Sequence, residues 1–233
     1  MPRATPRGAT VNGEKTLRRR LLITGTAGLV AAGALPGTAR ASGTARASGT
    51  VEPDVDGTQE WNARPPRGNV TVLGYRPDRI VVHHTVSANT SDLSRARAHA
   101  HAHWVQDLHM DGNGWIDTGY HFAVSRGGWI TEGRHGSLRT LTGGTSFVLG
   151  AHTSGQNDRA VGIACEGSYH AGAVPPQAQW EVLVVLCAYV CERYGIAPAR
   201  MYGHKDFNTG TLCPGVLHDM LPRLRDEVAA RLG

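Results

Sequence analysis

Two side chains that bind transition metals lie close together near the C-terminal end of the chain. His204 and Cys213 are separated by eight residues in the stretch 201–215, which reads MYGHKDFNTGTLCPG. The glycine, proline and small polar residues of this stretch indicate a loop. Imidazole and thiolate are ligands that zinc prefers, and one rigid loop can aim both at a single point. A chance histidine and a buried cysteine in a turn would look the same, so a metal site needs a further ligand from elsewhere.

A strand that ends in two histidines could supply that ligand. The segment 79–86 reads RIVVHHTV, and its β-branched residues predict a strand. The unbroken apolar run at 80–82 indicates burial on both faces, as in a central strand of a mixed sheet. His83 and His84 must point to opposite faces, so only one can face a cleft. A single histidine at a strand end is more often part of the core, but the incomplete ligand set on the C-terminal loop favours a ligand here.

Three more histidines fall in a predicted helix over residues 91–110, which Ser91 or Asp92 could cap. His99, His101 and His103 are spaced by two. This spacing turns successive imidazoles about 200° around a helix, so the three cannot converge on one ion. We therefore expect them on a solvated or half-buried helix face.

The remaining pattern predicts an α/β fold in which a central mixed sheet is flanked by about three helices. Residues 51–68 look like an extended arm laid over the domain, and the glycine- and threonine-rich sequence before residue 150 looks like a surface loop. Pro222 should kink or restart the last helix. Ligands in such folds lie at strand ends and adjoining loops, which suits His83 and the C-terminal loop. Strands are predicted over 70–73, 80–84, 119–125, 129–133 and 160–166, and helices over 91–110, 176–194 and 217–232.

The N-terminal segment resembles an export signal of the twin-arginine type. Residues 15–41 combine three consecutive arginines, an apolar, glycine-rich run and a small-x-small cleavage site. The repeated sequence GTARAS offers cleavage after Ala41 or Ala47. The run is too short and too rich in glycine for a stable membrane span, with an uncleaved anchor as the alternative. The chain is thus predicted to divide into a signal peptide (1–41), a flexible linker (42–59) and one zinc-binding domain (60–233).

The predicted signal also accounts for the basic charge of the chain. The 24 Lys and Arg against 19 Asp and Glu give a net charge of +5. Seven of the basic residues and one acidic residue lie within 1–41, so the remainder carries 17 positive and 18 negative side chains, about −1. Because no basic stripe is left, we expect no nucleic acid partner and, after signal cleavage, no membrane partner.

The four cysteines cannot all form disulfides if one of them binds metal. Export would permit disulfides, but Cys213 as a ligand leaves an odd number. Cys187 and Cys191 lie four residues apart on one helix face, where a disulfide is usually strained. The pairing of these two with Cys165 stays open. A twin-arginine substrate folds before export, so we expect Cys213 to take its metal as a thiolate before it meets an oxidant.

Six short motifs in a fixed order resemble one known family. They are Val-Val-His83-His84-Thr85, Gly-Trp115-Ile-Asp-Thr-Gly-Tyr120-His-Phe, Gly-Ala-His152-Thr, Val-Gly-Ile163, Gly-His204-Lys-Asp and Thr211-Leu-Cys213-Pro-Gly. This order resembles the type 2 N-acetylmuramoyl-L-alanine amidases, the superfamily of peptidoglycan recognition proteins and phage amidase lysozymes. The resemblance covers about residues 60–232, and six ordered motifs are a stronger signal than any one of them.

The resemblance implies one zinc ion held by His83, His204 and Cys213. It also implies that Tyr120 orients the water at the ion or relays its proton, and that Thr211 steadies the oxyanion.

The resemblance further implies a substrate groove lined by His152, with Thr85 and Trp115 as additional substrate-binding candidates. One departure concerns a branch of the family that places a catalytic glutamate directly after Gly-Ile. That position here is Ala164, and Glu166 follows two residues later. We interpret the chain as a member of the tyrosine-using branch, with Glu166 as a structural residue.

The predicted function is zinc-dependent hydrolysis of the amide between N-acetylmuramic acid and L-alanine in peptidoglycan, by a secreted, cell-wall-associated monomer. Three protein ligands would leave one tetrahedral position open, which is typical of catalytic zinc. Three alternatives remain: a recognition module that binds peptidoglycan without cleaving it, a zinc peptidase that cuts within the stem peptide, and a structural zinc with His84 or Asp206 as fourth ligand.

Overall fold

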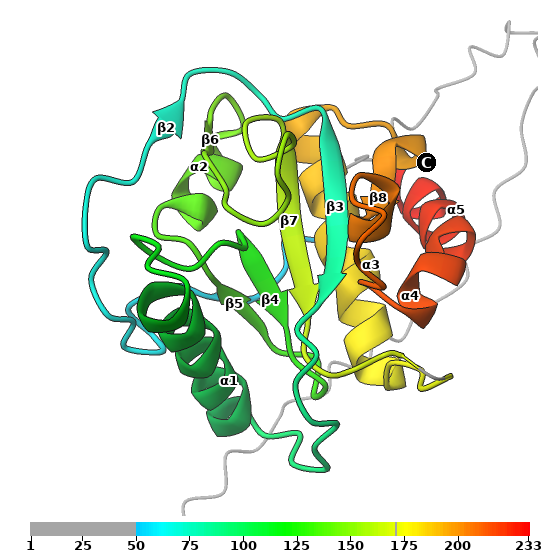
Figure 1. Ribbon diagram of the computed structural model, residues 1–233. Helices are drawn as coiled ribbons and strands as arrows, with labels where there is room; N and C mark the ends of the chain where they lie inside the picture. The colour runs from blue at the N-terminus through cyan, green and yellow to red at the C-terminus, as the bar shows by residue number, and fades with distance from the viewer. Residues whose placement is uncertain (1–49, 171) are drawn as a thin grey trace, which may run out of the picture. The chain divides into compact units, whose positions relative to one another are not determined.

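A six-stranded mixed sheet organises the part of the chain that the computed structural model describes, residues 50–170 and 172–233 (Figure 1). Its strands are β1 (Val55–Asp56), β3 (Arg79–His84), β4 (Phe122–Val124), β5 (Ile130–Glu132), β7 (Ala160–Cys165) and β8 (Met201–Gly203). The order across the sheet is β1-β5-β4-β7-β3-β8. Strands β4 and β5 pair antiparallel and all other neighbours pair parallel. The predicted mixed sheet is confirmed, with the histidine strand β3 inside it.

Long helices cover both faces of this sheet. The chain forms α1 (Arg95–Asp107) with a π-helical turn η1 (Leu108–Gly112), α2 (Ser137–Gly143), α3 (Gln177–Tyr194), a turn η2 (Pro198–Arg200), a turn η3 (His204–Asp206), α4 (Val216–Asp219) and α5 (Leu221–Leu232). Figure 1 shows α3 behind β7 and β3, and α1 on the side nearer the viewer. Most of α3 is apolar and buried, and Gly195 ends it in the left-handed conformation. No described helix is long and apolar enough to cross a bilayer.

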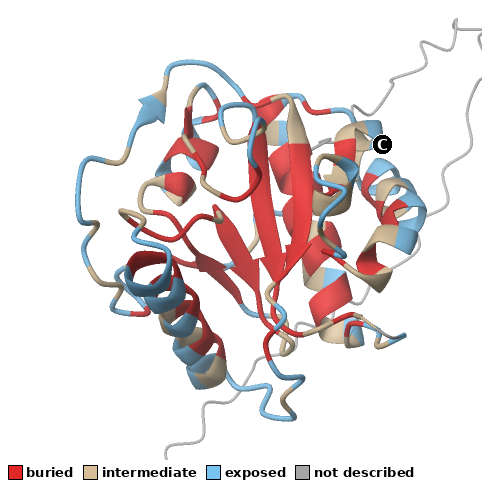
Figure 2. Cartoon of the chain, in the orientation of Figure 1, coloured by how far each residue is buried: buried red, intermediate tan, exposed pale blue. Residues whose placement is uncertain are grey.

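The two faces of the sheet differ in the size of their side chains. Side chains alternate along a strand, and one set, which includes Ile80, Val82 and Ile163, packs with α3 and α5 in the main apolar core. The other set includes His83 and the small residues Gly162 and Ala164 on the neighbouring strand β7. Figure 2 shows that these central strands are buried along almost their whole length, with only the start of β3, at Arg79, of intermediate exposure. Small residues on the second face leave room for functional side chains there.

Several predicted boundaries were wrong at the N-terminal side of the domain. Strand β1 pairs with β5 and lies inside the predicted linker, so packed structure begins before residue 60. Residues 72–73 do form a strand, β2, but it pairs with β6 (Phe147–Val148) in a separate two-stranded sheet. The cap of α1 is Ser94, whose hydroxyl accepts a hydrogen bond from the Arg97 N–H at 3.1 Å. The predictions on residues 1–41 lie outside the described part of the chain.

Two regions predicted as loops contain regular structure. The glycine- and threonine-rich region before residue 150 holds α2 and β6, and the stretch 201–215 begins with β8 and the turn η3. The prediction for the last helix was better, because the chain restarts between α4 and α5 with Pro222 in the first turn of α5. There the missing N–H of proline costs no helical hydrogen bond.

Candidate metal centre

Strand pairing brings two of the predicted ligands together. Strands β3 and β8 run parallel with Val82 opposite Gly203, so the next residues, His83 and His204, leave the sheet side by side. Their ring centroids are 4.8 Å apart. Cys213 returns to the same place, with its Sγ 3.7 Å from His83 Nδ1. Candidate ligand atoms of all three residues lie within 4.8 Å of one another.

The donor types fit a zinc ion, and the 3.7 Å between Cys213 Sγ and His83 Nδ1 is close to the spacing of two zinc ligands. Zinc–nitrogen bonds of about 2.0 Å and zinc–sulfur bonds of about 2.3 Å place tetrahedral ligand atoms about 3.5 Å apart. Burial and the neighbouring histidines hold the pKa of His83 well below its usual value, and burial lowers the pKa of His204. Both rings are therefore neutral at pH 7, as metal ligation requires. Burial raises the pKa of Cys213 to about 12, so a metal must displace its proton.

Hydrogen bonds and a close backbone crossing hold the loop that carries Cys213 in place. The Lys205 N–H donates to the Cys213 carbonyl at 2.8 Å, and the Cys213 N–H donates to the Thr211 hydroxyl at 3.2 Å. Gly215 has a φ of +67°, and a Cβ there would lie 2.2 Å from the Tyr169 carbonyl oxygen. Only glycine fits at this crossing, which explains the glycine after Cys-Pro. The His84 N–H also donates to Cys213 Sγ at 3.4 Å, a contact that favours a thiolate.

Neither residue considered as a fourth ligand joins the cluster. His84 lies on the other face of β3, where its Nδ1 accepts the Tyr169 N–H at 3.0 Å. The Asp206 carboxylate accepts the Gly203 N–H at 2.8 Å and contacts His218 Nε2 at 2.7 Å. Among the described residues, the cluster of potential ligands contains three members and no more. This arrangement disfavours a closed structural site.

Tyr120 lies next to the metal centre on an aromatic stack. Its ring centroid is 5.0 Å from that of His83 and 5.1 Å from that of His109, which in turn lies 4.7 Å from the Trp115 ring. His109 is fixed because its Nδ1 accepts the Gly119 N–H at 2.9 Å. Burial raises the pKa of Tyr120 well above its usual value, so the phenol keeps its proton and can donate it.

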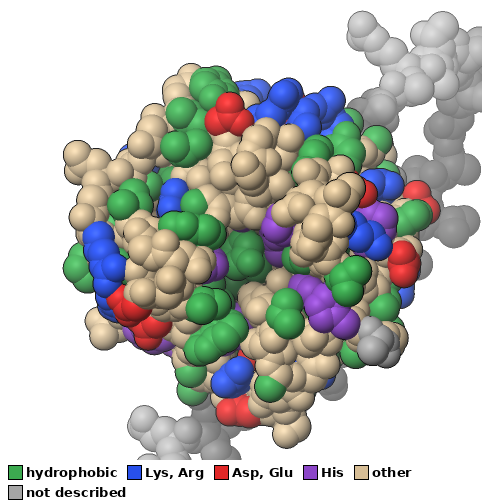
Figure 3. Space-filling view, in the orientation of Figure 1, with side chains coloured by type: hydrophobic (Ala, Val, Ile, Leu, Met, Phe, Trp, Pro, Cys, Tyr) green, Lys and Arg blue, Asp and Glu red, His purple; other side chains and the backbone are tan. Residues whose placement is uncertain are grey.

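An open pocket of about 430 Å³ reaches one of the three proposed ligands, His204. Trp115, His152 and His204 are among its lining residues, and Figure 3 shows a hollow with histidine side chains at its border on this face. Two of the three predicted substrate-binding residues thus line the pocket. Thr85 does not, because its hydroxyl lies 3.0 Å from both Ser87 Oγ and His101 Nε2. Its role in substrate binding stays a prediction.

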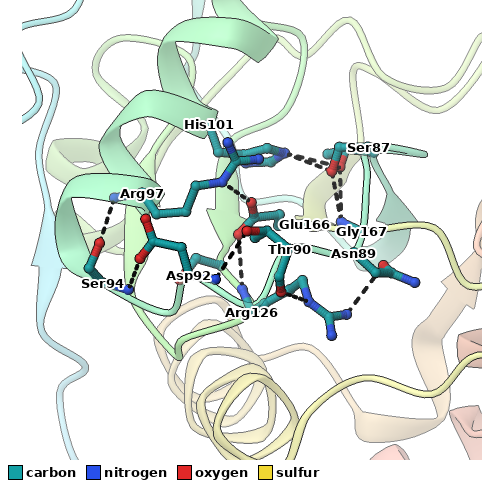
Figure 4. A network of polar contacts seen from close by, with 12 residues as sticks. Ser87, Asn89, Thr90, Asp92, Ser94, Arg97, His101, Arg126, Glu166 and Gly167 are labelled. Carbon is teal, nitrogen blue, oxygen red and sulfur yellow. Dashed lines mark hydrogen bonds and ion pairs between the residues drawn. The ribbon is translucent and has the colours of Figure 1, made fainter.

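Glu166 joins α1 to the sheet in a polar network that sequence reasoning missed (Figure 4). Its fully buried carboxylate accepts hydrogen bonds from Arg97 Nε at 2.9 Å and from the Arg126 N–H at 3.1 Å. His101 belongs to the same network and is buried, so the expected solvated or half-buried position was wrong for this histidine. An acidic residue directly after the apolar segment 160–165 was the available signal. These bonds give Glu166 a structural role.

A mixed sheet with a His-His-Cys cluster at its strand ends defines a class of protein, and comparison with known proteins identifies that class. A family model described as N-acetylmuramoyl-L-alanine amidase matches residues 73–216. The chain belongs to this amidase family, and the resemblance seen in the sequence motifs is confirmed.

Among curated relatives, a human N-acetylmuramoyl-L-alanine amidase is 33% identical over 164 residues, 69% of this chain and 26% of that protein. Peptidoglycan-recognition protein SC2 of Drosophila melanogaster is 27% identical over 156 residues, 67% of this chain and 77% of that protein. The chain spans only about a quarter of the length of the mammalian relatives.

Solved structures show the same fold. Drosophila PGRP-LB has a TM-score of 0.60 and 26% identity, with 76% of this chain and 93% of that chain covered. The endolysin LysCS of Clostridium intestinale, also titled an N-acetylmuramoyl-L-alanine amidase, has a TM-score of 0.55 and 27% identity, with 72% and 90% covered. A PGRP-LB mutant was solved in complex with tracheal cytotoxin.

Proposed function

We propose that this chain is a zinc-dependent N-acetylmuramoyl-L-alanine amidase that acts on peptidoglycan. The observation that carries the proposal is the convergence of His83, His204 and Cys213, whose candidate ligand atoms lie within 4.8 Å of one another beside an open pocket. Its family includes relatives named for this activity. Secretion by the twin-arginine route, cleavage of a signal over 1–41 and a monomeric state belong to the same proposal and rest on the sequence pattern alone.

A bound zinc ion would act as a Lewis acid that lowers the pKa of a coordinated water and polarises the scissile carbonyl. The side chains of this protein complete the site. His83, His204 and Cys213 would hold the ion. The Tyr120 phenol, whose pKa is raised by desolvation, would relay a proton toward the leaving amine. The Thr211 hydroxyl accepts the Cys213 N–H, which leaves its own proton available to the developing oxyanion.

The alternative function is a recognition module that binds peptidoglycan and leaves it intact. This alternative is supported by relatives that are named peptidoglycan-recognition proteins. An intact set of three metal ligands favours the enzyme, because an open zinc site supplies chemistry that binding does not need.

The first experiment compares wild type with Cys213→Ser, and uses Cys191→Ser as a matched control because that cysteine is also buried but lies outside the cluster. We expect about one zinc per wild-type and Cys191→Ser molecule, and release of dye from labelled cell walls by both. Cys213→Ser should lose most zinc and most dye release while still folding. Equal dye release by Cys213→Ser and wild type would refute zinc catalysis. Zinc binding without release would identify a recognition module.

The bond that is cut is identified by mass spectrometry of the soluble products. A free amino group on L-alanine supports the amidase. Products that retain intact muramoyl-alanine, with a break between amino acids of the stem peptide, would instead identify a peptidase.

A further inference from the structure

His152 connects a backbone carbonyl to one of the proposed metal ligands. Its Nε2 lies 3.1 Å from the Ala160 carbonyl oxygen, and its Nδ1 lies 3.0 Å from His83 Nε2. The two imidazoles are perpendicular, with ring centroids 5.1 Å apart. The contact joins residues that are 69 positions apart in the sequence. It is separate from the predicted contact of His152 with substrate.

The chemistry of these four atoms fixes where the protons lie. A carbonyl oxygen can only accept a hydrogen bond, so the Nε2 of His152 carries a proton. With its proton on Nε2, the neutral His152 ring holds a lone pair on Nδ1, the atom that faces His83. A lone pair on His83 Nε2, 3.0 Å away, would repel the lone pair on His152 Nδ1. The Nε2 of His83 must therefore carry a proton. The lone pair of His83 is then on Nδ1, the atom that lies 3.7 Å from Cys213 Sγ.

A neighbouring hydroxyl is consistent with the same assignment. Thr153 Oγ1 lies 3.0 Å from His152 Nδ1 and 3.4 Å from His83 Nε2. It can accept from His83 and donate to His152, which again leaves the proton on His83 Nε2.

The His152 ring has little freedom to leave this position. A Cβ on Gly162 would lie 2.5 Å from the ring, and one on Gly150 would lie 2.7 Å from it. The ring thus occupies space that exists because both positions are glycine. The His152 N–H also donates to Asn157 Oδ1 at 2.7 Å, which fixes the backbone below the ring.

We propose that His152 is a positioning residue that holds His83 in the Nε2–H tautomer and aims its Nδ1 at the metal. This inference rests on the proposed metal site. Outer residues that orient a metal-bound histidine typically contribute 10–100-fold to metal affinity. Ala160 and Gly162 take part indirectly, because the Ala160 carbonyl accepts a hydrogen bond from His152 Nε2–H and Gly162 leaves room for the His152 ring.

The test compares His152→Leu, which removes the acceptor at similar volume, with His152→Asn, whose side-chain oxygen can replace Nδ1. Zinc affinity is measured by competition with a chromophoric chelator. We expect His152→Leu to bind zinc about 10–100-fold more weakly than wild type, and His152→Asn to bind clearly more tightly than His152→Leu. Equal affinity of wild type and His152→Leu, or equal weakening in both variants, would overturn the proposal.

A second readout does not depend on zinc or on activity. Nitrogen-15 NMR of the zinc-free wild-type protein should show the His83 proton on Nε2. A proton on Nδ1 of His83 would overturn the proposal, whether or not His152→Leu folds. Thermal unfolding of the zinc-free variants shows whether His152→Leu is folded. If the wild type bound no zinc, the proposed function would fail, whereas the NMR measurement would still decide the tautomer.

Discussion

Tyr120 makes the sharpest prediction about a single residue. Its ring packs between His83 and His109, so Tyr120→Phe keeps the packing and removes only the hydroxyl. We expect amidase activity to fall by about 10²–10⁴-fold, the usual size of a general acid–base contribution, while zinc content stays at the wild-type level. Dye release and metal analysis check this result. Tyr75→Phe, at an exposed position, should behave as wild type. A Tyr120→Phe enzyme with near-normal turnover would exclude the proposed proton relay.

The sequence predicted which residues would converge better than it predicted what each would touch. The three proposed ligands do lie together, because their motifs sit at strand ends and on one loop. The link between His152 and His83 was not predictable, since no local pattern reports a contact across 69 residues. The contacts of the Thr85 hydroxyl with Ser87 and His101 were likewise not predictable. Such contacts depend on how the elements pack, and spacing in the sequence does not reveal them.

At the scale of elements, the Arg97–Glu166 pair fastens α1 to the end of β7. The Glu166 side chain is fully buried, whereas 31% of the Arg97 side chain is exposed. We expect Arg97→Met to lower the free energy of unfolding by about 2–3 kcal/mol, because it leaves a buried carboxylate without its ion pair. Glu166→Gln should cost less, since Arg97 can turn to solvent. Urea unfolding measures both.

Arg76→Met provides the control for this pair, because Arg76 is exposed on a loop and its loss should change stability by no more than about 0.5 kcal/mol. If Arg97→Met were as stable as this control, the ion pair would have no part in holding α1.

Among the elements, the sequence predicted the long ones and the hairpin strands β4 and β5, but it missed three very short strands. The long helices α1, α3 and α5 and the six-residue strands β3 and β7 carry enough apolar residues to show a pattern. The strands β1, β6 and β8 have only two or three residues, too few for an alternation to appear. They form because neighbouring strands offer hydrogen-bonding partners. This explains why the sheet was predicted with its centre correct and its edges missing.

At the scale of the whole molecule, buried neutral histidines make stability depend on pH. Burial lowers the pKa of His101 to about 3 and that of His109 and His121 to about 4. The unfolded chain, with an ordinary histidine pKa of about 6.5, therefore binds more protons than the native protein below that pH. This stability is complete above about pH 6.5 and is lost as the pH falls toward 4. His135, whose pKa is raised by its hydrogen bond to Asp117, acts in the opposite sense, since its contribution is lost as the pH rises.

We expect the free energy of unfolding of the zinc-free protein to fall between pH 7 and pH 5, with His101, His109 and His121 each contributing on the order of 1–2 kcal/mol. Urea unfolding at several pH values measures the slope. His101→Gln, which can still hydrogen bond but does not titrate, should lower the slope by about one proton. A urea midpoint that stayed constant over this range would contradict the assignment of these histidines as neutral and buried.

His83 and Cys213 meet although 130 residues separate them in the sequence. An ion held by both residues would close a loop that includes most of the domain. In an unfolded chain this closure would cost conformational entropy, and no strand pairing would compensate for that cost. During synthesis, β3 emerges long before the loop that follows β8. An ion bound by all three residues could therefore be captured only after the loop that follows β8 has emerged and folded against β3.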